Sequence, residues 1–383
     1  MPLIYIFAIL IVINYEGGPV MASKNKGTLK KILIWITSIL GAIILCVALF
    51  FGWLTIVEYR PDDVENVKIN GNNINSAINQ DSVYSILTWN VGYGALGDNA
   101  DFFMDGGNDV MTADKNRVNT NLKAMATEMI ACDPDFIFLQ EVDVKSRRSY
   151  KIDETSYFFN KLNECGNYQS AFAYNFKVKF IPYPIPPIGM VNGGIMTLSS
   201  YPIENASRIK LPCPFSWPVR LGNLKRCLLV TRIPAGNKEL VLINAHLEAY
   251  DNGTGKEEQT RLLRDIIDEE IRKGNYVIAG GDFNQTFSNI DTSAYPCYEG
   301  MWQCGKIDTD AFDNVSFIMD ERRPTCRSLD KAYVDADKDT FQYYMIDGFI
   351  VSNNIEILSC DTLDYDFKNT DHNPVLMQFK LGN

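Results

Sequence analysis

The longest apolar pattern in the chain is the run Ile32–Val57, which contains no charged residue. A helix rises about 1.5 Å per residue, so a helix over this run exceeds the ~30 Å hydrocarbon core of a bilayer. Trp35 and Trp53 lie near its ends, where indole rings favour the headgroup region. A core helix would not need to be apolar on every face, so the run predicts one transmembrane helix over residues 32–57.

The charges that flank this run indicate its direction. Four lysines precede it, whereas acidic residues predominate just after it. The positive-inside rule therefore places residues 1–31 in the cytoplasm and the body of a single-pass protein outside the cell membrane. Met1–Tyr15 is also apolar, but it is short and lacks a basic flank. It is either a second, interfacial segment or the product of a start site assigned before Met21.

Beyond Pro61 the pattern becomes polar and rich in asparagine, so we expect a flexible stalk over residues 58–82 and a folded body over 83–383. Within the body, apolar spacing at helical period predicts helices over Asp114–Ile130, Glu154–Leu162 and Glu257–Ile271. Short apolar runs between polar turns predict strands at Tyr84–Trp89, Phe136–Gln140, Gly194–Leu198, Cys227–Ile233, Leu240–Ala245, Tyr276–Ala279, Tyr344–Val351 and Val375–Phe379.

Composition narrows the class of protein. The chain has 383 residues, is 46% apolar and carries a net charge of −11. Residues 1–57 contribute +3, which leaves −14 for the rest and argues against a processive binder of nucleic acid. The cysteines form no C-x-x-C pair, and two histidines do not complete a zinc site of the usual spacing. We expect most cysteines to be buried and reduced, with a Cys297–Cys304 disulfide as the alternative.

Polar residues gather where the predicted strands end. The segments are Trp89-Asn90, Gln140-Glu141, Asn244-Ala245-His246-Leu247, Gly280-Gly281-Asp282-Phe283-Asn284, Ile346-Asp347 and Thr370-Asp371-His372-Asn373-Pro374. Taken singly, each is more often a turn or a solvated side chain than a catalyst. Together they supply the carboxylate and amide oxygens that Mg²⁺, Mn²⁺ or Ca²⁺ prefer, and both histidines of the chain. The set therefore predicts metal-assisted acid–base chemistry.

In this order the segments resemble the endonuclease/exonuclease/phosphatase superfamily, which includes deoxyribonuclease I and the neutral sphingomyelinases. The resemblance covers Tyr84–Phe379, and its most specific pieces are Gly-Asp-Phe-Asn and Thr-Asp-His-Asn-Pro. It implies a four-layer α/β/β/α sandwich of two mostly antiparallel sheets, here preceded by the transmembrane helix. It also implies hydrolysis of a phosphate ester by attack of an activated water.

The same resemblance implies roles for individual residues. Glu141 would bind the divalent metal, with Asn90 and Asp371 completing or bridging its shell. Asp282 and Asn284, on the same side of an extended segment, would orient the water and the phosphate. His372, oriented by Asp347, would act as general base or phosphate clamp. His246 would stabilise the phosphorane or assist the leaving oxygen, and Asn192 resembles the family's phosphate-contacting position.

The substrate stays open among three hypotheses. Two segments rich in apolar residues and proline, Phe176–Met190 and Cys213–Pro218, would form a rim suited to lipid if they border the site. A lipid headgroup is therefore the first hypothesis. A surface nuclease with Arg220, Lys225 and Arg226 in its groove is the second, and a non-catalytic binding protein is the third. The glycosylation sequon at Asn284 favours a prokaryotic surface protein, because a glycan there would block the site.

Overall fold

The computed structural model describes residues 25–251 and 253–382, and the chain divides into two compact units, Met1–Ile56 and Val57–Asn383. In the first unit, the predicted apolar helix is present as α1 (Asn25–Ile56). Its stretch Gly27–Ile56 is long and apolar enough to cross a membrane, as a signal sequence or an anchor does. The first apolar segment, Met1–Tyr15, lies outside the described residues.

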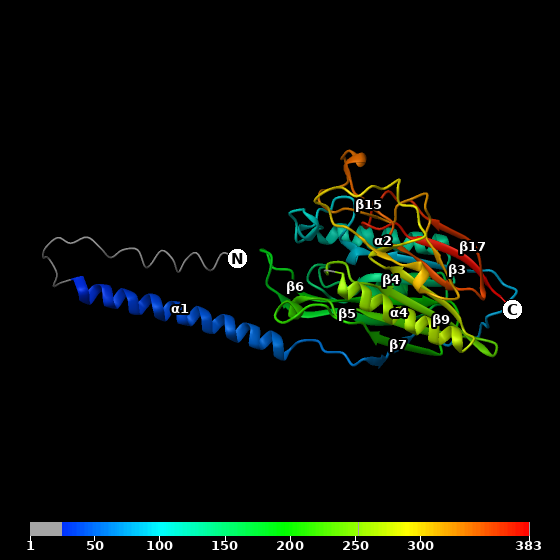
Figure 1. Cartoon of the computed structure of the whole chain (residues 1–383), viewed down its shortest axis with the longest axis horizontal. Helices are drawn as coiled ribbons and strands as arrows, with labels where there is room; N and C mark the ends of the chain where they lie inside the picture. The colour runs from blue at the N-terminus through cyan, green and yellow to red at the C-terminus, as the bar shows by residue number, and fades with distance from the viewer. Residues whose placement is uncertain (1–24, 252, 383) are drawn as a thin grey trace. The chain divides into compact units, whose positions relative to one another are not determined.

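The second unit is built on two seven-stranded mixed sheets (Figure 1). In each sheet one central pair is parallel, β9 with β10 and β3 with β4, and the other pairs are antiparallel. The first sheet has the order β1 (Val64–Asn66), β7 (Asn205–Lys210), β8 (Cys227–Ala235), β9 (Lys238–His246), β10 (Tyr276–Asp282), β16 (Asp347–Ser352), β13 (Val315–Ile318). The second has the order β17 (Ile355–Thr362), β18 (Val375–Leu381), β3 (Tyr84–Asn90), β4 (Phe136–Asp143), β6 (Gly189–Ser199), β5 (Gln169–Ile181), β2 (Ile69–Asn70).

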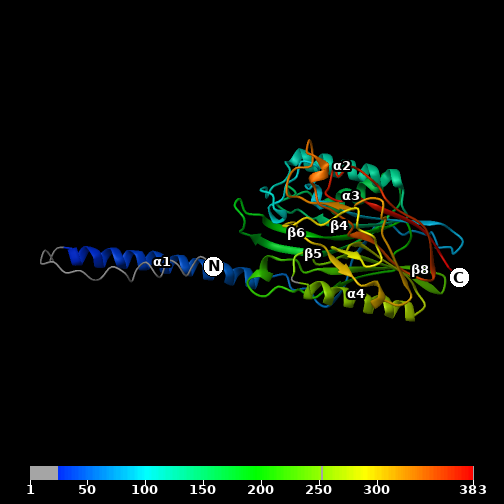
Figure 2. The ribbon, with the colours of Figure 1, turned by 45° about the horizontal axis from the view of Figure 1, so that its top comes forward.

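The two sheets pack face to face and helices cover their outer faces (Figure 2). Along β4, Phe136 and Phe138 enter the core between the sheets, while Ile137 and Leu139 pack under the helices α2 (Lys115–Cys132) and α3 (Glu154–Leu162). On the other side α4 (Thr254–Arg272) buries Leu263 and Ile267 against β9 and β10. Because successive side chains of a strand point to opposite faces, β4 contributes to two hydrophobic cores. The result is the expected four-layer, deoxyribonuclease I-like arrangement.

Several strands lie outside the predicted set, and one prediction is wrong. The run Tyr344–Val351 is not one strand: it is divided between β15 (Tyr343–Tyr344) and β16. β7 and β17 were missed because their sequences, NASRIK and IEILSCDT, are too polar to stand out from loops. The remaining short elements are β11 (Gln285–Phe287), β12 (Gly305–Ile307), β14 (Cys326–Arg327), η1 (Gly92–Gly94), η2 (Phe103–Asp105), η3 (Val219–Gly222), η4 (Thr309–Ala311) and η5 (Lys338–Thr340).

The expected flexible stalk over residues 58–82 is packed against the body instead. Within it, β1 pairs with β7 and β2 pairs with β5, so the segment extends both sheets. Three of its apolar residues, Val67, Ile69 and Ile78, pack against the inter-sheet core. Its polar composition is compatible with edge strands, because such strands form backbone hydrogen bonds with one neighbouring strand and bury only isolated side chains.

Candidate active site

The topology brings the polar segments to one end of the two sheets. Asn90, His246 and Asp282 are the last residues of β3, β9 and β10, and Glu141 lies near the end of β4. These four strands form the two parallel pairs, so their carboxyl ends meet at one edge. Asp347 begins the antiparallel β16 directly opposite Asp282, and His372 comes just before β18. One cleft of about 420 Å³ is lined by six of the predicted residues: Glu141, His246, Asp282, Asn284, Asp371 and His372. Asn90 does not line it, but its side chain contacts Glu141 and Asp282.

The glycine pair of Gly280-Gly281-Asp282 has a steric cause. A Cβ on Gly281 would lie 1.9 Å from the carbonyl oxygen of Ala245, and one on Gly280 would lie 2.4 Å from the ring of Phe349. Gly281 also has φ of +141°, which side chains rarely adopt. The two glycines let β10 fit closely between β9 and β16, which sets Asp282 opposite both His246 and Asp347.

Glu141 reaches the cleft through a break in its strand. The register of β4 with β6 shifts between Leu139 and Val142, and Glu141 has a left-handed φ of 55°. Such irregularities re-aim a side chain and cost energy, so they cluster at functional sites. Burial raises the pKa of Glu141, and the nearby Asp371 carboxylate raises it further, against the opposing effect of Arg148.

His372 is held on several sides. Its Nδ1 lies 2.8 Å from Oδ2 of Asp347, the partner that the sequence argument assigned to it. The indole Nε1 of Trp89 donates to the backbone oxygen of His372 at 2.9 Å, which fixes the loop. Burial alone would lower the pKa of His372, but the Asp347 carboxylate outweighs it and the pKa lies well above the usual value.

His246 has the opposite electrostatic environment. Burial lowers its pKa well below the usual value, and the cationic Arg226 and His372 lower it further. Its Nε2 lies 3.4 Å from Oδ2 of Asp282 and 3.9 Å from Oε1 of Glu141, while its Nδ1 is buried without a hydrogen-bond partner. The pKa values of the two histidines are therefore shifted in opposite directions, a difference that the sequence did not reveal.

Asp282 is the centre of these contacts. Its Oδ2 accepts a hydrogen bond of 3.0 Å from Nδ2 of Asn90 and lies 3.9 Å from Nε2 of His372. Asn90 also donates to Glu141 at 3.4 Å, so one amide bridges two carboxylates. Burial, with the neighbouring Asp347 carboxylate, raises the pKa of Asp282 to about 7.

One predicted geometry is wrong. Asn284 does not sit at i+2 of an extended segment, because its φ is +50° and the chain turns after Asp282. Its backbone N–H donates to Oδ1 of Asp282 at 2.9 Å, its Nδ2 donates to the carbonyl of Leu247 at 2.9 Å, and the residue lines the cleft. Asn192 is absent from the cleft lining; its backbone pairs with Ser146 instead. Asn175, on the neighbouring β5, lines the cleft with a buried, unpartnered Nδ2.

Two other motif residues tie the sheets together rather than line the site. Nε2 of Gln140 on β4 donates to Oδ1 of Asn244 on β9 at 2.8 Å, and Nδ2 of Asn244 donates to the carbonyl of Met196 on β6 at 2.9 Å. Gln140 also contacts Thr88 on β3. All of these groups are buried. Two of the motif positions thus form a buried polar link between the sheets.

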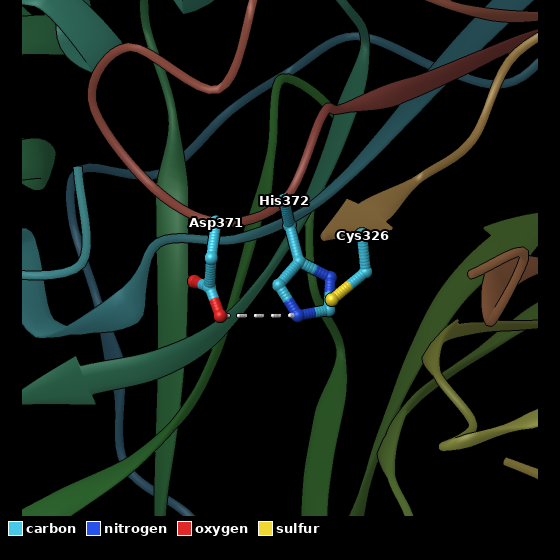
Figure 3. Close-up of side chains that lie close together, drawn as sticks. All are labelled: Cys326, Asp371 and His372. Carbon is cyan, nitrogen blue, oxygen red and sulfur yellow. Dashed lines mark ion pairs between the residues drawn. The ribbon is translucent and has the colours of Figure 1, made fainter. Parts of the chain in front are cut away.

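Two groups of side chains with metal-ligand geometry share His372: one also contains Asp282 and Asp347, and the other Asp371 and Cys326. Figure 3 shows the latter group, in which His372 lies between Asp371 and Cys326. Nε2 of His372 is 4.0 Å from Oδ2 of Asp371. Burial raises the pKa of the Cys326 thiol to about 12, so the sulfur is protonated here. Cys326 was not predicted as a neighbour of the site; the β-bridge between Cys326 and His372 brings them together.

The nine cysteines are free in the described residues, including Cys297 and Cys304.

The donor set fits a hard divalent cation. Glu141 and Asp371 are carboxylates in a cleft whose burial raises the pKa of both, so their ionised forms lack sufficient positive charge nearby. A buried oxygen of Asp347 has no hydrogen-bond partner either. Ions such as Mg²⁺ are held by carboxylate and amide oxygens and would compensate this charge.

The walls of the cleft were only partly predicted. Of the two apolar segments, Phe176–Met190 does border the cleft through Phe176, Ile181, Tyr183 and Ile188, whereas Cys213–Pro218 is followed by lining residues but contributes none. Arg148, whose guanidinium lies 3.6 Å from the ring centroid of Tyr93 and pairs with Asp143, was missed. Neither its spacing nor its neighbours in sequence distinguish it from a surface arginine.

The basic groove expected for a nuclease is electrostatically compensated. Arg220 and Lys225 both pair with Glu58 at 3.3 Å. Arg226 pairs with Glu248 at 3.3 Å and donates to the backbone oxygen of His246. These three cations are therefore already paired, so they provide little attraction for a polyanion.

Comparison with known proteins agrees with this geometry. The sequence model of the Endonuclease/Exonuclease/phosphatase family matches residues 87–361. No curated protein matches the chain. An endonuclease/exonuclease/phosphatase from Beutenbergia cavernae DSM 12333 is 17% identical, with a TM-score of 0.51 over 79% of this chain and 72% of that one. ANGEL2, a 2',3'-cyclic phosphatase in complex with adenosine-2',3'-vanadate, is 12% identical, with a TM-score of 0.51 over 82% and 99%. These likenesses concern the fold, and the family match covers most of the second unit: the chain belongs to the endonuclease/exonuclease/phosphatase family.

Proposed function

We propose that this protein is a membrane-anchored, divalent-cation-dependent phosphoesterase that hydrolyses a phosphodiester or phosphomonoester, with a lipid headgroup as the favoured substrate. The observation that carries the proposal is the convergence of Glu141, Asp282, His246 and the His372–Asp347 pair in one cleft. In this proposal α1 is retained as the anchor, and the second unit lies outside the cell membrane of a prokaryote.

The metal would be Mg²⁺, or Mn²⁺ or Ca²⁺, held by Glu141 together with Asp371 and Asn90. When bound, such an ion polarises a phosphoryl oxygen and neutralises developing negative charge. Asn90 as oriented here donates its amide to Glu141 and Asp282, so its first contribution is to fix those carboxylates. The side chains around them then do the positioning.

The proton transfers follow from the unequal environments of the acid and base groups. Asp282, with its pKa near 7, accepts a proton from the attacking water as the new P–O bond forms. The bond from phosphorus to the leaving oxygen breaks, and the His372 imidazolium supplies the proton for that oxygen. A proton then returns from Asp282 to His372 across the 3.9 Å between them. Neutral His246 and the unpartnered amide Nδ2 of Asn175 hold the phosphoryl oxygens.

The test uses the full chain purified in detergent, with bis-p-nitrophenyl phosphate and p-nitrophenyl phosphate as substrates. We expect turnover with Mg²⁺ that EDTA abolishes and added Mg²⁺ restores. His372→Ala and Asp282→Asn should each lose about 100-fold or more in kcat. The control Asp291→Asn, at an exposed turn, should keep its activity. Absence of turnover with Mg²⁺, Mn²⁺ and Ca²⁺ would reject the enzymatic function and favour a binding protein.

A further inference from the structure

We propose that the mouth of the cleft docks on the lipid bilayer through an apolar rim formed by Tyr183, Ile185, Trp217 and Val219. The substrate is then a phosphate ester carried by a membrane lipid, taken directly from the bilayer surface. The inference rests on the proposed function, because it assigns the substrate class of that same site.

The rim consists of large apolar side chains that are each more than half exposed. Ile185 is 92% exposed and Tyr183 is 71% exposed, both in the turn between β5 and β6. Val219 is 57% and Trp217 is 53% exposed, in the loop between β7 and β8. Prolines at 182, 184, 186, 187 and 218 flank them and limit the conformational entropy that docking would cost. Clustered exposed apolar groups of this kind mark an interaction surface.

The rim continues into the cleft. From Tyr183 the apolar wall passes through Ile181, Ile188 and Phe176 toward Asn175 and the catalytic groups, and all of these line the same cleft. The second loop joins the same wall, because the backbone N–H of Lys225 donates to the carbonyl of Asn175 at 2.6 Å. A ligand with an apolar body and a phosphate head would therefore contact apolar side chains at the mouth and polar groups at the floor.

The start of the second unit is fastened beside this rim. Glu58 is buried and pairs with Arg220 and Lys225, which lie in the loop that carries Trp217 and Val219. Glu58 is two residues beyond Ile56, the last residue of α1. Two residues of extended chain reach about 7 Å. If α1 is anchored in a bilayer, the rim loop is therefore held close to the point where the chain leaves that bilayer, which identifies the bilayer as the occupant of the rim.

Charge decides which interaction dominates at this surface. Residues 58–383 carry a net charge of −14, and Arg220 and Lys225, in and after the loop segment that carries Trp217 and Val219, are paired with Glu58. Attraction to anionic lipid is therefore weak, and burial of apolar side chains must supply the docking free energy. We expect docking to zwitterionic phosphatidylcholine vesicles, and we expect it to persist at high salt.

The first experiment reads contact without activity. The full chain is reconstituted in phosphatidylcholine vesicles that contain a phospholipid with a photoactivatable diazirine, and labelled peptides are identified by mass spectrometry. Residues 182–188 and 215–221 should be labelled at least five times more than the peptides around Val334 and Leu358, which carry exposed apolar residues elsewhere. Equal labelling of all four peptides, or no labelling of the first two, would overturn the proposal.

The second experiment separates docking from chemistry. A double variant, Ile185→Ser with Trp217→Ser, removes two rim side chains that do not line the cleft. It should lose at least tenfold in hydrolysis of bilayer phospholipid and stay within twofold of the natural chain on bis-p-nitrophenyl phosphate. The matched control is Val334→Ser with Leu358→Ser, which should retain both activities.

The two hypotheses fail in different ways. If soluble diester is hydrolysed but the rim variant keeps full activity on bilayer phospholipid, the docking proposal is wrong and the enzymatic function stands. If no phosphate ester is hydrolysed but the rim is labelled by lipid, the docking proposal survives in its contact and the enzymatic function does not. Crosslinking of the rim to another protein in place of lipid would also overturn the docking proposal.

Discussion

Single side chains decide the chemistry of this site. Asp347 illustrates this, because one of its oxygens holds Nδ1 of His372 while the other is buried without a partner. The adjacent carboxylate raises the pKa of His372 against the opposing effect of burial. A neutral amide at this position would preserve the shape of the site and remove that charge.

We therefore expect Asp347→Asn to lower kcat by about 100-fold with a small change in KM. The pKa of His372 is raised in the natural chain, so the acid form persists to high pH. In the variant that pKa falls, and the alkaline limb of the pH–rate profile should move to lower pH. Kinetics between pH 5 and 10 measure both effects. An unshifted alkaline limb would show that Asp347 has only a structural role, and Asp313→Asn, at an exposed position, is the control.

Gly281 makes a second residue-scale prediction. Gly281→Ala forces a Cβ into the carbonyl of Ala245 at a strained φ, so we expect a loss of about 3 kcal/mol or more in unfolding free energy. Gly236→Ala has a left-handed φ of 69° but open space, and it should cost only about 1 kcal/mol. Urea unfolding followed by circular dichroism compares them. Equal losses would mean that φ alone, and not the contact with β9, requires the glycine.

At the scale of elements, the site depends on how the two sheets are held together. Gln140 on β4 and Asn244 on β9 join them through buried side-chain amides. Both lie beside the functional residues Glu141 and His246 in the sequence, and this adjacency is why the sequence could not separate their roles. Strands that end in catalytic groups need a fixed distance between sheets.

Removing one partner of this tie leaves the other unsatisfied. Gln140→Ala and Asn244→Ala should each lower the unfolding free energy by about 2–3 kcal/mol. The double variant should lose less than the sum by about 1 kcal/mol, because the two groups share one interaction. Gln378→Ala, exposed on β18, is the control. Strict additivity in the urea unfolding of these variants would contradict the tie.

The contact of α4 with β8 gives a pH-dependent prediction. Burial acts to raise the pKa of Glu270, but hydrogen bonds from Arg232, Lys273 and Asn275 outweigh it and lower the pKa to about 2. Because the folded pKa lies below the unfolded one, this stabilisation is present above about pH 4.5 and disappears as the pH falls toward 2.

Glu270→Gln should therefore lose about 2 kcal/mol at pH 7, with a difference from the natural chain that shrinks below pH 4.5. Urea unfolding at pH 7, 5 and 3.5 measures this. The neighbouring Glu269→Gln removes an exposed carboxylate that pairs with Lys273 alone, and it should leave the stability nearly unchanged. A constant difference at all three pH values would argue against the ion pair as the cause.

At the scale of the whole molecule, the first question is what becomes of α1. A helix this apolar near the N-terminus serves as a cleaved signal or as a retained anchor. We predict retention: the full-length chain should stay in the membrane pellet after extraction with alkaline carbonate. Intact-mass spectrometry of the extracted protein measures its length. A shorter, soluble chain that lacks the apolar stretch would identify a signal sequence and would remove the geometric basis of membrane docking.

The sequence by itself determined the apolar helix, the main strands and the group of functional residues. Each of these depends on local properties: helical or alternating periodicity, and residue types with a limited set of chemical uses. Asp282 and His372 could be selected because their motifs are dense in polar groups that strands do not otherwise need.

Only the tertiary structure decided where those residues lie and what surrounds them. It shifted the pKa values of the two histidines in opposite directions, because these shifts depend on partners distant in sequence. It placed Asn175 and not Asn192 in the cleft lining, brought Cys326 and Arg148 there, and turned the expected stalk into edge strands. Burial, register and long-range pairing set these outcomes, and none of them is encoded in the spacing of a single segment.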